Sequence, residues 1–473
     1  MSPSRAERSA AAESSRRAEE KLATRRRMRE VTEEILRRAP ESDVAPSLDR
    51  IVAVLELLGD PQRSFPMVHV TGTNGKTSTT RMIEVLLREL GLSTGRFTSP
   101  HLHDIRERIA LSGEPISREA FLATYDDVLP YLEMVDARSL AGGGPRLTYF
   151  ETVVALAYAA FADAPVDAAV VEVGMGGSWD ATNAADGAVA VVTPIGLDHQ
   201  KFLGDTLEEI ADEKAGIIKP DAIMVSAAQD IEAAEVLRER CAQVGAVSVV
   251  EDVDIAVLQR SQAVGGQLVT LRGMAGDYRD LFLPLHGAHQ AHNALLALAA
   301  AEAFVGGGER PLERDVVEQA FAAFTSPGRL EVVRRSPLVV VDAAHNPHGA
   351  RALAAAIEEE FIGVPMIGVI GVLGDKDAEG ILAALEPVLA EVVVSRSTSP
   401  RALAPERLGE LAAEVFGEHR VSVVADLPDA LDAAAGLSDA VASGGGTGGA
   451  VLVTGSITTA AEARTLLGAG SPS

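Results

Sequence analysis

Short, continuous apolar runs alternate along the chain with segments in which apolar residues recur at helical spacing. Before residue 326 the strand-like runs span residues 67–71, 168–174 and 188–195, and the helix-like segments include 77–90 and 206–218. Strands that are apolar at every position are typical of a parallel sheet covered by helices on both faces. This part of the chain is therefore predicted to form an α/β domain with a mainly parallel sheet.

A second alternating series follows the segment SPGRLEVV at 326–333, which we interpret as a linker. Its helical segments are rich in alanine, and its strand-like runs span residues 338–344, 366–373, 390–397, 421–426 and 450–456. Such alternation again predicts an α/β domain with a parallel sheet. The chain is thus divided into a larger domain at 46–326 and a smaller one at 327–473.

Residues 1–45 have a different pattern, rich in Arg, Glu, Ala and Ser. We interpret them as a flexible arm that begins disordered and becomes a polar helix from Ala18 to Arg38. A solvated extension is favoured over an interaction arm, because the segment begins without a sustained apolar face. The following segment, 48–62, reads as a helix ended by Gly59 and Pro61.

Composition adds limits on the class of protein. The 473 residues include 68 acidic and 42 basic ones, for a net charge of −26, which argues against general attraction to nucleic acid or an anionic membrane. The single cysteine, Cys241, excludes internal disulfides and a cysteine-cluster metal site. No apolar run could span a bilayer, and the N-terminal segment lacks the apolar core of a secretory signal. These features predict a cytoplasmic protein, without distinguishing an enzyme from a binding protein.

A candidate phosphate-binding loop lies in VHVTGTNGKTSTTRM, residues 68–82. A strand, a glycine turn and a helix start would leave backbone N–H groups free to bind an anion. Lys76 adds a positive charge, and the Thr77 hydroxyl is placed to contact a phosphate-bound Mg²⁺. However, only two residues separate Gly72 from Gly75, where the commonest phosphate loop has four. The alternative interpretation, a simple turn before a buried helix, therefore remains open.

Other polar residues follow the predicted strands, where α/β sheets bind their ligands. Glu172 ends one apolar run, Asp198 and His199 follow the next, and Asp342 with His345 follows a strand of the smaller domain. The Pro-broken loop FTSPHLHDIRERI at 97–109 could grip an anion or a metal. Lys214, beside Glu213 in a helical pattern, could equally form a surface ion pair.

Together these motifs resemble the folylpolyglutamate synthase/dihydrofolate synthase family of the Mur ligase superfamily, over roughly residues 48–463. The family motifs occur in order as TGTNGKTS, FTSPHL, EVGMGGSWDATN, GLDHQKFLGDT, EKAGIIK, HGAHQAHNA, SPGRLE, DAAHNPHG and VTGS. The short GTNGK loop is this superfamily's own form, which accounts for the spacing. Many members have Gly and then Ser after the lysine, whereas this chain has Thr77 and Ser78, so a hydroxyl is retained.

The resemblance implies a P-loop-type ATPase domain at 46–326 and a Rossmann-like ligase domain at 327–473. It also implies transfer of the γ-phosphate of ATP to a substrate carboxylate, giving an acyl phosphate that the amine of L-glutamate attacks. The loop at 97–109 resembles members with a pterin site, so we expect both dihydropteroate and folates as substrates. Alternatives are folate polyglutamylation alone or a peptidoglycan ligase. Peptidoglycan ligases usually carry an extra N-terminal domain, whereas only about 65 residues precede the loop here.

Two further alternatives have less support. A nucleotide-dependent switch would not need a second metal-binding His or a modified lysine. A dinucleotide oxidoreductase would rest on GVIGVLGDKD at 368–377, which lacks the GxGxxG pattern.

The resemblance also assigns roles to individual residues. Nucleotide contacts are expected from Gly72, Thr73, Asn74, Gly75, Lys76, Thr77, Ser78, Asn293, Arg329 and Asp342. One Mg²⁺ is expected at Ser99 and Glu172 with Thr77 nearby, and a second at His199 with Glu172. Catalytic roles are expected for Lys76, Lys214, Arg329 and His345, with Lys214 matching the lysine that family members carry as a carbamate. Substrate contacts are expected from Pro100, His101, Arg106, Arg108 and Asp180, and Asn183 is expected to shape the site.

A monovalent cation is a further candidate cofactor. The expected partners are small molecules only (ATP, L-glutamate and a pteroate or folate), with no nucleic acid or membrane, and family precedent favours a monomer.

Overall fold

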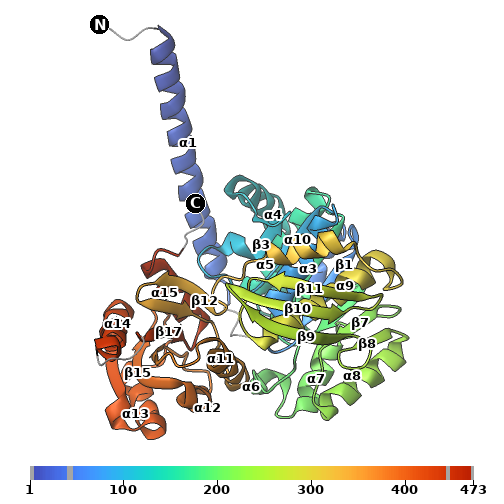
Figure 1. Cartoon of the computed structure of the whole chain (residues 1–473). Coiled ribbons are helices and arrows are strands. Elements are labelled where there is room, and N and C mark those ends of the chain that lie inside the picture. Colours follow the sequence, from blue (N-terminus) through green and yellow to red (C-terminus); the bar gives the residue numbers. More distant parts are fainter. Residues whose placement is uncertain (1–4, 40–45, 444–447, 470–473) are drawn as a thin grey trace.

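The computed structural model describes residues 5–39, 46–443 and 448–469. Figure 1 shows two α/β bodies side by side, with the long helix α1 projecting from the larger one. Each of the five apolar core clusters in the described residues lies wholly before Ser326 or wholly after Arg329. The two predicted alternating series therefore correspond to two separate cores.

The larger domain is built on an eight-stranded sheet of order β4-β3-β2-β5-β1-β6-β7-β8. Six strands are parallel, and β3 and β4 form an antiparallel edge. Its strands are β1 (Met67–Thr71), β2 (Thr94–Phe97), β3 (Ile109–Leu111), β4 (Glu114–Pro115), β5 (Ala168–Glu172), β6 (Val189–Val192), β7 (Ile223–Ser226) and β8 (Val247–Val250). The three predicted strands are confirmed as β1, β5 and β6, although β5 and β6 end two or three residues early. The residues that follow β5 and β6 therefore leave the sheet and contribute to the site.

Helices cover both faces of this sheet, as the uniformly apolar strands predicted. Their bounds are α2 (Asp49–Leu57), α3 (Lys76–Glu89), α4 (Arg118–Ala141), α5 (Tyr149–Asp163), α6 (Gln200–Leu203), α7 (Leu207–Ala215), α8 (Ile231–Val244), α9 (Ala288–Gly306) and α10 (Arg314–Ala322). The middle strand β1 is buried at every position and contributes side chains to both cores, with Val68 and Val70 facing α3 and Met67 facing the opposite cluster.

A second sheet in this domain was not predicted. It is antiparallel, of order β11-β10-β9, and consists of β9 (Ala256–Ala263), β10 (Gly266–Arg272) and β11 (Asp277–Leu283). Val269, Leu271 and Leu281 pack into the same cluster as α9. Because only one face is buried, its strands mix polar and apolar residues and lack the continuous apolar runs used for prediction.

The smaller domain has a six-stranded sheet of order β12-β13-β17-β14-β15-β16, parallel except for the edge strand β12. Its strands are β12 (Glu331–Arg335), β13 (Leu338–Val341), β14 (Met366–Ile370), β15 (Leu389–Arg396), β16 (Val421–Asp426) and β17 (Ala450–Thr454). Its helices are α11 (Pro347–Glu360), α12 (Ala378–Leu385), α13 (Pro405–Phe416), α14 (Leu427–Ser443) and α15 (Ile457–Leu466). All five predicted strands are confirmed. The predicted linker is too long, because its second half forms β12.

The N-terminal helix α1 (Arg5–Leu36) begins earlier than the predicted Ala18 and is not solvated along its whole length. Met28, Val31 and Ile35 lie one helical turn apart and are buried in the core beside α2 and α4. The end of the arm is therefore part of the larger domain. Within the described residues, no helix has both the length and the apolar character needed to cross a bilayer.

Candidate active site

The loop between β1 and α3 has the backbone of a phosphate cradle. Gly72 and Gly75 have φ of 139° and 89°, in the region that favours glycine. A Cβ on Gly72 would lie 1.9 Å from Thr193 Oγ1, and one on Gly75 would lie 2.5 Å from Asn293 Oδ1. Helix α3 starts at Lys76 without a side-chain cap, so its first N–H groups face an anion site.

Two lysine ammonium groups meet at this loop. Lys76 Nζ donates to the carbonyls of Gly72 and Thr73 at 3.0 and 3.1 Å. Lys214 Nζ, from α7, donates to the same Gly72 carbonyl at 2.9 Å. Burial lowers the pKa of both amines, and that of Lys214 falls to about 7, with the charge of Lys76 as the second cause. The alternative of a surface ion pair for Lys214 is therefore wrong, because its side chain is buried against the loop.

Glu172 ends β5, directly beside β1, and is buried within hydrogen-bond reach of the loop. Its two carboxylate oxygens accept from Thr77 Oγ1 at 2.8 Å and from the Ser99 N–H at 3.2 Å. Desolvation raises the pKa of this carboxyl, while the charge of Lys76 opposes the rise. Carboxylate and hydroxyl oxygens at a phosphate site are the donors that Mg²⁺ takes, so these residues fit a Mg²⁺ ion.

No group of three His, Cys, Asp or Glu side chains in the described residues could hold a metal by itself.

Asp198 gathers residues from both domains. One of its oxygens accepts from Lys376 Nζ at 2.7 Å, and the other accepts from Asn346 Nδ2 at 2.8 Å. The imidazoles of His199 and His345 lie 3.9 and 4.0 Å from the second oxygen. Although burial opposes it, His199 and Lys376 hold the pKa of Asp198 well below its ordinary value.

The two histidines beside Asp198 are neutral near pH 7. Desolvation lowers the pKa of His199 to about 3 and that of His345 to about 4. His345 is held by its Nδ1, which lies 3.0 Å from the Ala343 carbonyl. A small cavity of about 30 Å³ is lined by Lys214, His199 and His345, among others. A neutral histidine beside this space is compatible with a metal ligand, and an amine with a pKa of about 7 is compatible with a carbamate.

The smaller domain meets the phosphate loop through α11. Asn74 and Asn346 form a reciprocal amide pair with both N···O distances 3.2 Å, and Asn74 Nδ2 lies 2.8 Å from His348 Nδ1. Asn346 also caps α11 by accepting from the Gly349 N–H at 2.7 Å. The N-terminus of α11 is thereby held against the nucleotide loop.

Asp342 and Arg329 lie in the wall of the same cavity. The Asp342 carboxylate accepts from the N–H groups of Leu330 and Ala344, each at 2.8 Å, so it fixes the linker as well as facing the cavity.

Most of these groups line a cavity of about 820 Å³ between the domains, whereas Gly72, Asp198 and Lys214 line the smaller cavity. Its wall includes three aromatic residues of the larger domain, Phe150, Trp179 and Phe202, and polar residues of the smaller domain, Ser399, Arg401, Ser456 and Thr458. The expected site residues that line these two cavities are Thr73, Asn74, Gly75, Lys76, Thr77, Ser78, Ser99, Pro100, His101, Glu172, Asp180, His199, Asn293, Arg329, Asp342 and His345 in the larger, and Gly72 and Lys214 in the smaller.

Three expected residues act behind the cavity wall. Arg106 pairs with Asp104 at 2.8 Å, and Arg108 donates to His101 Nδ1 at 2.9 Å, so Arg108 orients His101. The Asn183 amide donates to the carbonyls of Ser178 and Gly216, which ties the DATN segment to the end of α7.

Sequence reasoning missed Lys376 and two pairs in the cavity wall, Arg50–Glu151 and His292–Glu251. Lys376 follows the apolar run of β14. The rule that selected Glu172 and His199, that α/β sheets bind ligands where their strands end, could also have selected Lys376. The pairs join distant segments, and no local pattern marks them.

Comparison with known proteins agrees with this geometry. Two family models match, the Mur ligase middle domain at residues 132–301 and the Mur ligase, glutamate ligase domain at residues 328–457. A dihydrofolate synthase/folylpolyglutamate synthase of Mycobacterium tuberculosis is 50% identical over 447 residues, covering 91% of this chain and 92% of that protein. The Escherichia coli protein of the same name is 33% identical over 370 residues, covering 77% and 80%.

Solved structures are similar over almost the whole chain. Mycobacterium tuberculosis folylpolyglutamate synthase complexed with ADP and AMPPCP matches with a TM-score of 0.90 and 48% identity, covering 96% of this chain and 100% of that one. An FPGS–AMPPCP–folate complex matches with a TM-score of 0.79 and 31% identity, covering 93% and 99%. The chain therefore belongs to the dihydrofolate synthase/folylpolyglutamate synthase family of the Mur ligases.

Proposed function

We propose that this enzyme uses ATP to join L-glutamate to dihydropteroate and to the γ-carboxylate of folates. The observation that carries the proposal is the cavity of about 820 Å³, whose wall combines the phosphate loop with aromatic residues of the larger domain and polar residues of the smaller domain. Phe150 and Trp179 offer flat apolar faces suited to a bicyclic heteroaromatic ring. The names of the relatives and the folate complex of a structural neighbour support the same substrates.

The chemistry follows from the groups around the loop. A carboxylate is a poor electrophile, so its oxygen first takes the γ-phosphoryl group, which releases ADP and forms an acyl phosphate. The amine of glutamate then attacks the acyl carbon, loses a proton and expels phosphate. Lys76, Arg329 and the first N–H groups of α3 place positive charge around the transferred phosphoryl group.

Two Mg²⁺ ions would be held by Ser99, Glu172 and Thr77 and by His199 with Glu172. When bound, they neutralise charge on the phosphates. We also propose that Lys214 is carbamylated: its neutral amine adds to CO₂ and releases one proton. Support comes from its burial and from its pKa of about 7, which leaves much of the amine neutral. The described residues assign no ligand set to a monovalent cation.

A paired-substrate assay tests the proposal. ADP release is measured with ATP, Mg²⁺ and L-glutamate, and with either dihydropteroate or tetrahydrofolate as acceptor. Both acceptors must be tested because the relatives differ in name. One from Lacticaseibacillus casei is named only folylpolyglutamate synthase, and one from Saccharomyces cerevisiae is named only dihydrofolate synthetase. We expect glutamate-dependent product with both acceptors.

The other outcomes are equally decisive. No release with dihydropteroate would leave polyglutamylation alone, and no release with either acceptor would refute the proposal. A UDP-sugar peptide precursor as acceptor tests the peptidoglycan alternative. We further propose a cytoplasmic monomer, on the precedent of the family.

A further inference from the structure

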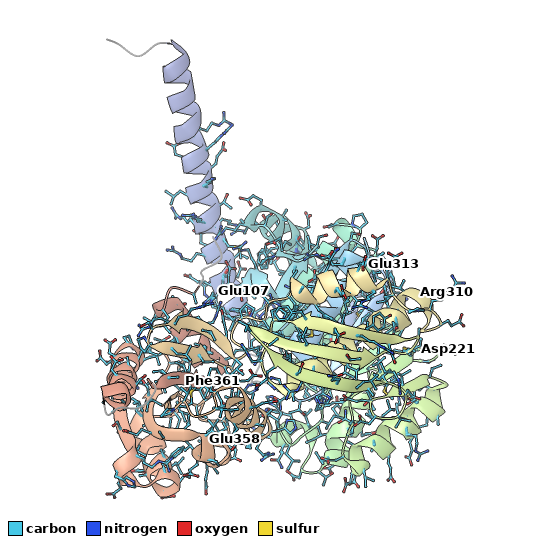
Figure 2. All side chains as sticks on the ribbon, viewed as in Figure 1. Glu107, Asp221, Arg310, Glu313, Glu358 and Phe361 are labelled. Atoms are coloured by element: carbon cyan, nitrogen blue, oxygen red, sulfur yellow. The ribbon has the colours of Figure 1, made fainter. Side chains whose placement is uncertain are left out.

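The loop that carries Ser99 is held in shape by one half-buried carboxylate, that of Glu107. Glu107 accepts from the N–H groups of Leu102, His103 and Asp104 at 2.8, 3.0 and 3.0 Å. Figure 2 shows Glu107 near the junction of the two domains. The Ser99 loop, defined as residues 98–104, is therefore a hydrogen-bonded platform at the interface, and its Ser99 N–H donates to Glu172.

The imidazole of His103 leaves this platform and contacts α15 of the smaller domain. Its Nε2 lies 3.0 Å from Arg464 Nη1, and its Nδ1 lies 3.3 Å from Thr465 Oγ1. A guanidinium can only donate, so Nε2 must accept and Nδ1 must carry the proton. The hydrogen-bond network thus assigns a neutral His103 that receives a hydrogen bond from the other domain.

Arg464 continues the connection to the linker. Its guanidinium forms a two-pronged pair with Glu331, at 2.7 and 3.2 Å, and Glu331 also accepts from the Gly328 N–H at 2.7 Å. A Cβ on Gly328 would lie 3.9 Å from Leu102 and 4.0 Å from Arg464, so the linker passes close to both.

Arg329 is fixed by the residues on either side of it. Gly328 is bound to Glu331, and the Leu330 N–H is bound to Asp342. The hydrogen bonds that hold Gly328 and Leu330 therefore also fix the backbone of Arg329, and so the point from which its side chain extends towards the cavity.

We propose that His103, Arg464 and Glu331, together the His103 clasp, are positioning residues that couple the Ser99 loop to Arg329. The two segments lie in the wall of one cavity but belong to different domains. The clasp exists only when α15 lies against the Ser99 loop, so both segments reach their working positions when the domains meet. Phosphoryl transfer depends strongly on such positioning.

The kinetic test uses the full chain and rests on the proposed function. His103→Ala removes the acceptor, whereas the side-chain oxygen of His103→Gln can still accept from Arg464. We expect His103→Ala to lower kcat about tenfold and to change the KM for ATP less than about threefold, with His103→Gln recovering most of the loss. Arg464→Met should act in the same way, and the double variant should be no slower than the slower single one.

A matched control is His419→Ala, since His419 is exposed on the smaller domain away from the cavity. We expect it to leave kcat unchanged. Wild-type kcat in His103→Ala, equal losses in His103→Ala and His103→Gln, or additive losses in the double variant would each overturn the proposal.

A second measurement does not depend on the substrates. Amide hydrogen exchange is followed with ADP and Mg²⁺ bound, in the wild type and in His103→Ala. The coupling requires faster exchange in both the Ser99 loop and residues 326–331 of the variant. A change confined to one segment would refute it. If the wild type fails to ligate either acid while both segments respond, the proposed function fails and the clasp stands.

Discussion

Replacing Lys214 with methionine would separate the catalytic value of this amine from its effect on stability. The side chain is buried, and its ammonium lies on the Gly72 carbonyl beside the ammonium of Lys76. Methionine has a similar length and no charge, so it removes the amine while filling the same space. We expect a variant that is more stable than the wild type and almost inactive.

The magnitude follows from the pKa. Its fall from 10.5 to about 7 corresponds to about 5 kcal/mol of unfavourable free energy for the charged form. The native-state pKa is depressed, so this cost is complete below pH 7, shrinks as the pH rises and disappears above about pH 10.5, where both states are neutral. The lost hydrogen bond to Gly72 offsets about 1 kcal/mol at every pH. We therefore expect a net gain of about 3–4 kcal/mol at pH 6–7 that fades towards pH 10.

Urea unfolding from pH 6 to 10 in CO₂-free buffer measures the stability, and glutamate-dependent ADP release measures the activity. We expect activity to fall about 100-fold or more, because the amine that would carry the carbamate is gone. Lys214→Ala should lose most activity and regain part of it with added formate or acetate. Lys21→Met is the control, since Lys21 is exposed on α1. Full activity in Lys214→Met, or a destabilisation that does not vary with pH, would refute the reasoning.

Three other substitutions test separate parts of the site. Glu172→Gln keeps the acceptor for Thr77 but removes the charge, so kcat should fall about 100-fold and the Mg²⁺ requirement should rise; a rate within threefold of the wild type would contradict this. Arg50→Met leaves the buried Glu151 carboxylate, now 3.0 Å from Arg50, without this cation, and should cost about 3–5 kcal/mol in urea unfolding; the double variant with Glu151→Gln should recover most of it. Asn346→Ala removes both the α11 cap and the pair with Asn74, so we expect a loss of about 1 kcal/mol and a higher KM for ATP. Asn346→Ser should restore the stability but not the KM for ATP.

The parts of the site that could be predicted are those fixed by local sequence. The apolar run of β1 followed by Gly72 and Gly75 specifies a strand and a loop with positive φ, whatever lies around it. Glu172 ends β5 and His199 follows β6, the two parallel strands on either side of β1, and the carboxyl ends of such strands meet at one edge of the sheet. Position along a strand was therefore enough to bring these residues together.

The rest depends on contacts between segments far apart in the chain. Asn346 looks like an ordinary surface residue until the start of α11 approaches Asp198. Lys214 lies in a polar helical segment, and its side chain is buried against the Gly72 loop, which is distant in the sequence. The side chains of Met28 and Val31 form a narrow stripe on a helix that is otherwise polar, so composition concealed their packing.

The shared Gly72 carbonyl links nucleotide binding to the state of Lys214. One oxygen accepts from both ammonium groups, and the charge of Lys76 contributes to the low pKa of Lys214. A bound phosphate offers Lys76 a charged acceptor, which is a stronger partner than a carbonyl. A carbamate at Lys214 replaces a repelling cation with an anion and so favours the charged form of Lys76. Each event therefore makes the other more favourable, because both relieve the same crowding of positive charge at one carbonyl.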